Sequence, residues 1–89
     1  MNKEWNYING AYEFYFYPYE EDNLVLTFMQ DKNNENVFWY SSDMLKVEYD
    51  CIEARNVESA KEEFEDMIFN ELEDRAAYYS RLSDVFWER

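Results

Sequence analysis

Apolar side chains recur at steps of three and four residues between Val57 and Asp74, which is the spacing of one face of an α-helix. The members of this row are Val57, Ala60, Phe64, Met67, Ile68 and Leu72. Asn56 comes directly before it and suits the N-cap position, because its side-chain oxygen can accept a hydrogen bond from the first helical turn. The pattern therefore predicts a helix with one face against a core and the other in solvent.

The same helical period continues beyond Asp74, in a stretch without Gly or Pro. Its apolar members are Ala76, Tyr79, Leu82 and Phe86. Either one helix runs from residue 57 to about 86, or a break near 73–77 makes two. A continuous helix would extend for about 45 Å, which exceeds the width of a small sheet. We therefore expect a break, after which the second part folds back or projects.

Before the helix, the pattern changes to the shorter alternation of β-strands. The predicted strands are 11–17, 24–30, 36–41 and 44–52. In the last of them, one set of apolar residues is expected to point inward: Leu45, Val47, Tyr49 and Cys51. Residues 1–10 end in the turn signal Asn9-Gly10 and fit either a short edge strand or an ordered arm.

The two faces of the sheet depend on the turn between the second and third predicted strands. Asn tolerates positive φ, so Asn33-Asn34 suits a two-residue turn, which would pair Phe28 with Trp39. One face would then carry Leu26, Phe28, Val37 and Trp39. The other would carry Thr27, Met29, Phe38 and Tyr40.

The sheet face away from the helix is expected to be strongly aromatic. Its members would be Tyr15, Tyr17, Val25, Met29, Phe38 and Tyr40. We expect the N-terminal residues Trp5 and Tyr7 or the C-terminal segment to cover it; the residues available in that segment are Tyr78, Phe86 and Trp87. Otherwise the face is an exposed Tyr-rich patch, which is typical of a protein interface.

These elements predict a single α+β domain over residues 1–89, with an antiparallel sheet of about four strands and a C-terminal acidic helix packed on one face. Aromatic residues make up 21% of the chain, which provides apolar area for a core in so short a chain. The single cysteine, Cys51, cannot form an intrachain disulfide, and its inward position predicts an inert packing group.

The net charge of −13 comes from 21 acidic and 8 basic residues. Such a chain is repelled by phosphate backbones and anionic membranes, so we expect no direct binding to nucleic acid or to a membrane. The sequence contains neither a signal peptide nor an apolar run of about 20 residues. We therefore expect a cytoplasmic protein, monomeric or homodimeric, whose partners are basic proteins.

Catalytic signatures are missing from the sequence. It contains no histidine, its only cysteine is Cys51 and its only glycine is Gly10, which removes the usual general base, zinc-site and phosphate-loop patterns. Its acidic runs lack the alternate spacing and central glycine of an EF-hand. We therefore expect a protein that is not an enzyme and that needs no cofactor or metal.

Carboxylates are concentrated on the predicted helix, where Val57–Asp74 contains eight of them against one base, Lys61. Like charges one turn apart on a helix repel by about a few tenths of a kcal/mol. Because the sequence tolerates this repulsion, we infer that the acidic face has a function. One turn, about 5.4 Å, is also similar to the spacing of phosphates along a DNA strand. The predicted partner-binding acids are Glu58, Glu62, Glu65, Asp66, Glu73 and Asp74, together with Glu20, Glu21 and Asp22 in the loop after Pro18.

With its strands over 11–52, its acid-dense helix from Val57 and its Asn-, Tyr- and Glu-rich composition, the chain resembles the small acidic inhibitors of phages and mobile elements. Examples are anti-CRISPR proteins, anti-restriction proteins and the uracil-DNA-glycosylase inhibitor, and the immunity proteins of nuclease toxins are similar in style. The resemblance covers the whole chain and concerns length, charge and element order. It implies action in the bacterial cytoplasm, in the basic nucleic-acid channel of a host enzyme.

We therefore expect a stoichiometric inhibitor of a nucleic-acid-binding enzyme, such as a Cas nuclease, a restriction enzyme or a toxin nuclease, that acts as a DNA mimic. Aromatic side chains would anchor the contact, because they supply much of the energy of protein interfaces. The expected anchors are Tyr17, Tyr19, Tyr78 and Tyr79. The alternative is a small structural or adaptor protein, homodimeric through its aromatic sheet face or C-terminal helix, whose acidity only keeps it soluble.

Overall fold

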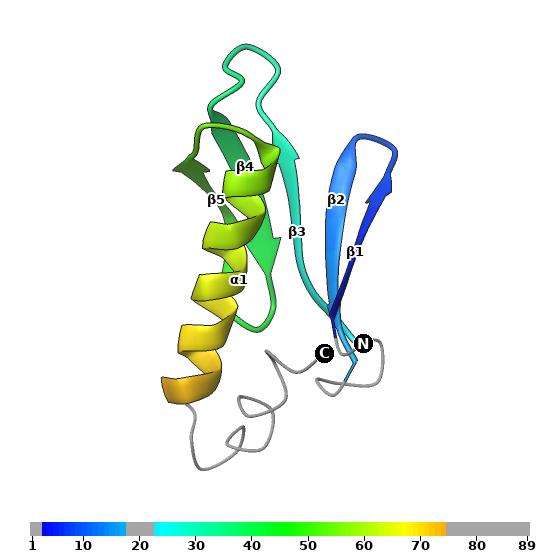
Figure 1. Cartoon of the computed structure of the whole chain (residues 1–89), viewed down its shortest axis with the longest axis vertical. Coiled ribbons are helices and arrows are strands. Elements are labelled where there is room, and N and C mark those ends of the chain that lie inside the picture. The colour runs from blue at the N-terminus through cyan, green and yellow to red at the C-terminus, as the bar shows by residue number, and fades with distance from the viewer. Residues whose placement is uncertain (1–2, 18–22, 75–89) are drawn as a thin grey trace.

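In the computed structural model, which describes residues 3–17 and 23–74, an antiparallel sheet of five strands is followed by a single helix. The elements are β1 (Lys3–Ile8), β2 (Ala11–Phe16), β3 (Leu24–Gln30), β4 (Val37–Ser42), β5 (Val47–Glu53) and α1 (Val57–Asp74). Each strand pairs with the next one along the chain, so the sheet is a meander (Figure 1). The predicted α+β class, sheet first and helix last, is confirmed.

The sheet gains its fifth strand because residues 3–8 form an edge strand instead of an arm. β1 and β2 meet at Asn9-Gly10, where both residues have positive φ, 52° and 83°. Two successive positive φ angles are typical of the tight turn that matches the twist of paired strands. The hairpin aligns Trp5 with Phe14, and their rings stack with centroids 4.6 Å apart.

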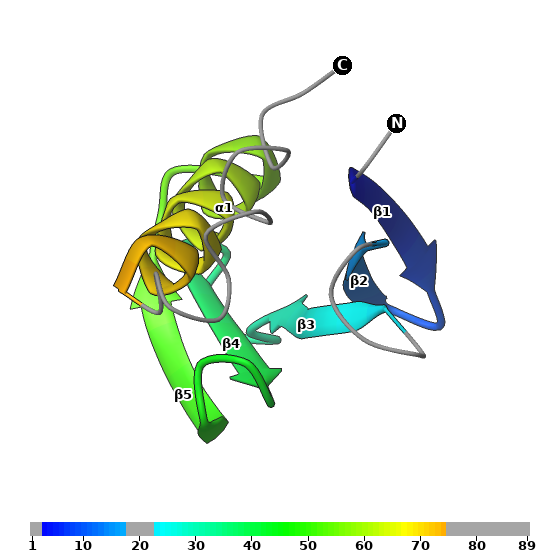
Figure 2. The same ribbon diagram turned by 90° about the horizontal axis from the view of Figure 1, so that it is seen from below.

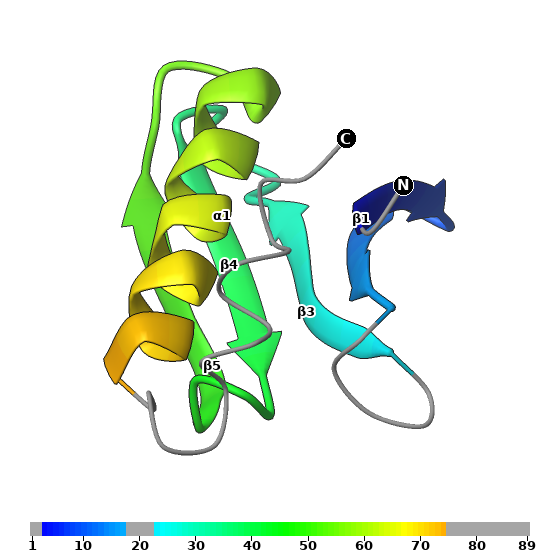
Figure 3. The same cartoon turned by 60° about the horizontal axis from the view of Figure 1, so that its bottom comes forward.

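The strands form an arc, and α1 lies inside it against the concave face (Figures 2 and 3). Phe64 of α1 is central to this contact, since its ring lies 4.8 Å from that of Phe28 and 5.0 Å from that of Tyr40. The buried core consists of Phe14, Phe16, Val25, Leu26, Phe28, Phe38, Tyr40, Met44, Ala60, Phe64, Ile68 and Leu72. Large rings supply much of its area, which compensates for the shortness of the chain.

The start and the inner face of α1 are as predicted. The backbone N–H of Ser59 donates to Oδ1 of Asn56 at 2.8 Å, which is the contact of an N-cap. The fully buried positions recur at steps of four residues: Ala60, Phe64, Ile68 and Leu72. Whether the helical pattern beyond Asp74 forms one helix or two lies outside the described residues.

The predicted register between β3 and β4 is wrong by one residue. Phe28 lies opposite Tyr40, and Met29 lies opposite Trp39. Because side chains alternate along a strand, this shift exchanges the two faces of β4. Phe38 and Tyr40 therefore point toward α1 and are buried, whereas Trp39 points to the other side.

The register shift between β3 and β4 is caused by the loop between them, which is longer than a two-residue turn at Asn33-Asn34. It spans residues 31–36 and is closed by a hydrogen bond of 2.8 Å from the backbone N–H of Asp31 to the carbonyl of Val37. Neither Asn33 nor Asn34 has the positive φ that the tight turn requires.

The inward face predicted for 44–52 is correct for Leu45 and Val47, which pack against the core, and wrong for Tyr49 and Cys51. Cys51 lies opposite Trp39 and shares its face, away from α1, so Cys51 is exposed and is not a packing group. Tyr49 is exposed as well. Ile52, one residue further along β5, is the side chain that packs against the core.

Candidate functional site

The outer side of α1 carries an exposed band of carboxylates. Its exposed acids are Glu58, Glu62, Glu63, Asp66 and Glu73. At 3.6 residues per turn, Glu62, Asp66 and Glu73 lie within about 40° of one another, opposite the buried stripe, over a length of about 17 Å. These three residues, called the outer row below, form the part of the predicted acidic face that is free to meet a partner.

The only base of α1, Lys61, turns toward the sheet instead of the outer row. Its ammonium lies 5.7 Å from the ring centroid of Trp5 and 5.3 Å from that of Tyr12. It also lies 3.8 Å from Oε1 of Glu58. Aromatic faces attract cations, so these contacts favour the inward position of Lys61. The helix therefore has no base of its own on the outer row.

Glu65, also predicted to bind a partner, lies on the flank of α1 that faces β1. Its Oε1 is 2.7 Å from the ammonium of Lys3, and its Oε2 accepts a hydrogen bond of 3.0 Å from the indole of Trp5. Both side chains of the ion pair are largely shielded from solvent, with 21% and 19% of their surface exposed. Glu65 thus joins the helix to the sheet, and its charge is compensated within the fold.

A cavity of about 520 Å³ lies beside this contact, between β1 and α1. Its lining consists of Lys3, Glu4, Trp5, Tyr17 and Glu65. Tyr17, a predicted anchor, is exposed, and its hydrogen bond to Glu4 raises the pKa of its hydroxyl. The ammonium of Lys3 and the carboxylate of Glu65 are paired with each other, so these charges stabilise the fold.

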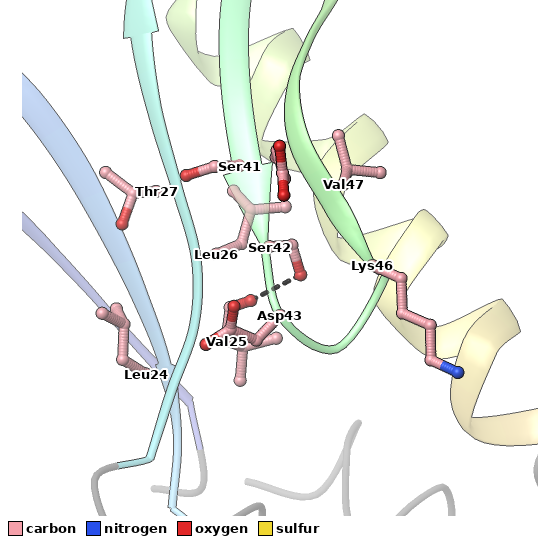
Figure 4. Close-up of a pocket in the computed structure, with 10 residues that line it drawn as sticks. Leu24, Val25, Leu26, Thr27, Ser41, Ser42, Asp43, Lys46 and Val47 are labelled. Atoms are coloured by element: carbon pink, nitrogen blue, oxygen red, sulfur yellow. Dashed lines mark hydrogen bonds between the residues drawn. The ribbon is translucent and has the colours of Figure 1, made fainter.

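A second cavity, of about 540 Å³, lies where β3 and β4 separate (Figure 4). At its floor, the hydroxyl of Ser42 donates to the carbonyl of Val25 at 2.7 Å and accepts from the backbone N–H of Leu45 at 3.1 Å. The side chain of Lys46 extends away from the cavity (Figure 4). Ser42 therefore holds the end of β4 in place and is not arranged as a nucleophile.

The sheet face opposite α1 is partly exposed and aromatic, but its members differ from those predicted. Val25, Phe38 and Tyr40 are buried in the core instead. In their place, Trp39, Tyr49 and Cys51 accompany Met29 and Tyr15, of which Met29 and Tyr49 are well exposed. The one-residue shift of β4 explains why the sequence pattern missed Trp39, and the wrong inward face predicted for 44–52 explains why it missed Tyr49.

The N-terminal residues do not cover this face. Trp5 packs on the side of α1, where its ring lies 4.6 Å from that of Phe14 and 5.4 Å from that of Phe28. Tyr7 lies beside Tyr12 in the same hairpin, with ring centroids 4.6 Å apart. Of the two coverings predicted, the one by Trp5 and Tyr7 is therefore wrong, and the one by the C-terminal segment with Tyr78, Phe86 and Trp87 lies outside the described residues.

Several predicted site residues lie outside the described residues: Tyr19, Glu20, Glu21, Asp22, Tyr78 and Tyr79. Asp74 is the last residue of α1. Within residues 3–17 and 23–74, no three His, Cys, Asp or Glu side chains are grouped so that they could hold a metal ion. Nor does this part of the chain contain a helix with the length and apolar character needed to cross a membrane.

The arrangement thus presents two surfaces suited to contact with another molecule, the outer row of α1 and the aromatic sheet face opposite it. No protein-family model, curated protein or solved structure matches the chain.

Proposed function

We propose that the protein is a stoichiometric inhibitor of a nucleic-acid-binding enzyme and occupies a basic channel of that enzyme as a DNA mimic. The observation that carries this proposal is the inward position of Lys61, which leaves Glu62, Asp66 and Glu73 without a base on their side of the helix. An acidic helix that served solubility alone would interleave acids and bases, because such pairs stabilise it. The uncompensated row instead favours a basic partner.

The net charge of −13 supports the same proposal. A strongly negative field attracts a basic surface over long range and raises the rate of encounter. Carboxylates of the outer row would then take the place of phosphates against Lys and Arg side chains of the enzyme. Glu65 is not part of this contact surface, since Lys3 and Trp5 already hold its carboxylate.

The test is a pull-down from bacterial lysate with the tagged protein, at low and physiological salt, with and without competing duplex DNA. We expect a nucleic-acid-binding enzyme to be retained and to be displaced by DNA. The variant Glu62→Lys with Asp66→Lys should lose this enzyme and its inhibition. Both positions are exposed, so the fold should tolerate the change.

The matched control is Asp43→Lys with Glu48→Lys, which changes the net charge by the same amount at exposed positions outside the helix. This control should retain the enzyme nearly as well as the unmodified chain. If the helix variant binds as tightly as the control, the outer row is not the contact surface and the proposal fails.

The alternative, a structural or adaptor protein that dimerises through its aromatic sheet face, is favoured by the exposure of Met29 and Tyr49 on that face. The charge of −13 on each copy opposes it, because two such chains repel each other. Sedimentation at micromolar concentration separates the two proposals. A stable dimer that is lost in Tyr49→Ala would support the alternative.

A further inference from the structure

The sheet face opposite α1 contains an ordered aromatic pair. The rings of Trp39 and Tyr49 stack with centroids 4.8 Å apart and an interplanar angle of 10°. Met29 lies beside Trp39 on β3, and 43% of its surface is exposed, as is 66% of that of Tyr49. We call these three residues the aromatic platform. Apolar surface left exposed in this way is costly in water, which is typical of a binding site.

A carboxylate is fixed at the edge of the platform. The indole N–H of Trp39 donates to Oδ1 of Asp31 at 2.9 Å, and the backbone N–H of Asn33 donates to Oδ2 at 2.8 Å. These bonds hold the pKa of the Asp31 carboxyl below its ordinary value, so it is ionised at neutral pH. A carboxylate can accept about four hydrogen bonds, so Asp31 retains acceptor capacity toward a ligand.

Asp31 has no cationic partner among the described residues. The ion pairs within residues 3–17 and 23–74 are Lys3–Glu65 and Lys61–Glu58. Glu53 provides a second carboxylate on the same face. It is exposed and lies opposite Val37, which is two residues before Trp39 on β4 and therefore points to the same side of the sheet. The platform is therefore apolar at its centre and carries the carboxylates of Asp31 and Glu53 at its rim.

The charge of this rim decides between the possible occupants. A second copy of the chain would bring another net charge of −13 and a rim of the same sign. A cationic group meets a complementary surface instead. Among cationic side chains, arginine fits best, because its planar guanidinium both stacks on aromatic rings and donates paired hydrogen bonds to a carboxylate.

We propose that the aromatic platform, with Asp31 at its edge, binds an arginine side chain of a basic partner protein. The guanidinium lies against the stacked rings and donates to Asp31. Lysine binds less well, because a compact ammonium cannot stack on the rings and donate to the carboxylate in the same way. This site lies on the opposite side of the sheet from α1, so it is independent of the outer row and goes beyond the function proposed above.

The experiment is an NMR titration of the isotope-labelled full chain with a short capped peptide of alternating glycine and arginine, and with its lysine counterpart. We expect chemical-shift changes at the indole N–H of Trp39 and at Asp31, Met29 and Tyr49. The arginine peptide should bind several-fold more tightly than the lysine peptide. Tyr49→Ala should weaken the arginine peptide about 3- to 5-fold, as expected for an exposed cation–π contact, and Asp31→Asn should weaken it to a similar extent.

Two variants serve as matched controls. Tyr7→Ala removes a tyrosine that is 63% exposed and that also contacts one neighbouring ring, but lies on the α1 side of the sheet. Glu63→Gln removes an exposed carboxylate of the helix. Both should bind the arginine peptide as the unmodified chain does. The variant Glu62→Lys with Asp66→Lys should also keep the preference for arginine over lysine, which separates this test from that of the outer row.

Three results would overturn the proposal. The first is equal binding of the arginine and lysine peptides, which would indicate charge attraction alone. The second is an unchanged affinity of the arginine peptide for Tyr49→Ala, with shift changes confined to α1. The third is concentration-dependent broadening at Trp39 and Tyr49 in the absence of peptide, which would show that a second copy covers the platform.

Discussion

The ammonium of Lys3 lies 2.7 Å from Oε1 of Glu65, which joins the first strand to the helix across 62 residues of sequence. The indole of Trp5 donates to the other oxygen of Glu65 at 3.0 Å. Because β1 is an edge strand, this contact holds the far end of the curved sheet against α1. Glu65 therefore stabilises the fold, whereas the exposed acids of the same helix face solvent.

We predict that Glu65→Ala lowers the free energy of unfolding by about 1–3 kcal/mol, because it removes the carboxylate that contacts the Lys3 ammonium and accepts from the indole of Trp5 in a partly buried place. Urea denaturation measures this change. Glu62→Ala, one turn earlier and exposed, should change stability by no more than about 0.5 kcal/mol. Equal effects of the two substitutions would show that the contact with β1 contributes nothing.

Phe64 is the side chain through which α1 meets the middle of the sheet, in contact with the rings of Phe28 and Tyr40. We predict that Phe64→Ala costs about 3–5 kcal/mol, from lost burial and the cavity that remains. That is a large part of the total stability of a small domain, so unfolded chains should be detectable by NMR in water. Phe64→Leu fills most of the space and should stay folded. A folded, cooperative Phe64→Ala would mean that the core can collapse around the gap.

The helix could be predicted from the sequence because its period is repeated over many residues and begins at a recognisable cap. The exposure of Glu62, Asp66 and Glu73 follows from that period alone. The role of Glu65 cannot be predicted from this period, since it depends on Lys3, which is distant along the chain. A helical wheel places Glu65 on the flank of the apolar stripe, but only the folded sheet determines that Lys3 meets it there.

The register of β3 and β4 could not be predicted because residues 37–40 are apolar at every position. Either register buries two large side chains, so burial does not choose between them. The choice is made in the loop, where the side chains of Asp31 and Asn34 accept backbone hydrogen bonds from Asn33 and Asn36 and lengthen the turn. The aromatic platform is a direct consequence of this local geometry.

The Asn9-Gly10 turn permits a further prediction, because φ of Gly10 is 83°. A Cβ at this position would meet nothing within 4 Å, so the cost of Gly10→Ala is one of backbone conformation alone. We expect a loss of about 1–2 kcal/mol, with early hydrogen exchange in β1. Gly10→Asn should cost less, because Asn accepts positive φ more readily. If Ala and Asn are equivalent there, the hairpin has adopted another turn.

The hydrogen bond from Trp39 to Asp31 predicts that the stability of the fold depends on pH. The indole N–H holds the pKa of the Asp31 carboxyl below its ordinary value of 3.8, and the backbone N–H of Asn33 adds to this. A folded-state pKa below the unfolded one contributes stability that is present above about pH 3.8 and is lost as the pH falls through the folded-state pKa. Stability should therefore decline in that acidic range and not near neutrality.

Trp39→Phe isolates this contribution, because it removes the indole donor and keeps an aromatic ring. We expect the pKa of Asp31, followed through its carboxyl carbon by NMR, to move up toward 3.8 in this variant. Its free energy of unfolding should also vary less with pH below about pH 4 than that of the unmodified chain. An unchanged titration of Asp31 would mean that the indole does not hold the carboxylate in solution, and the edge of the aromatic platform would then lack its fixed charge.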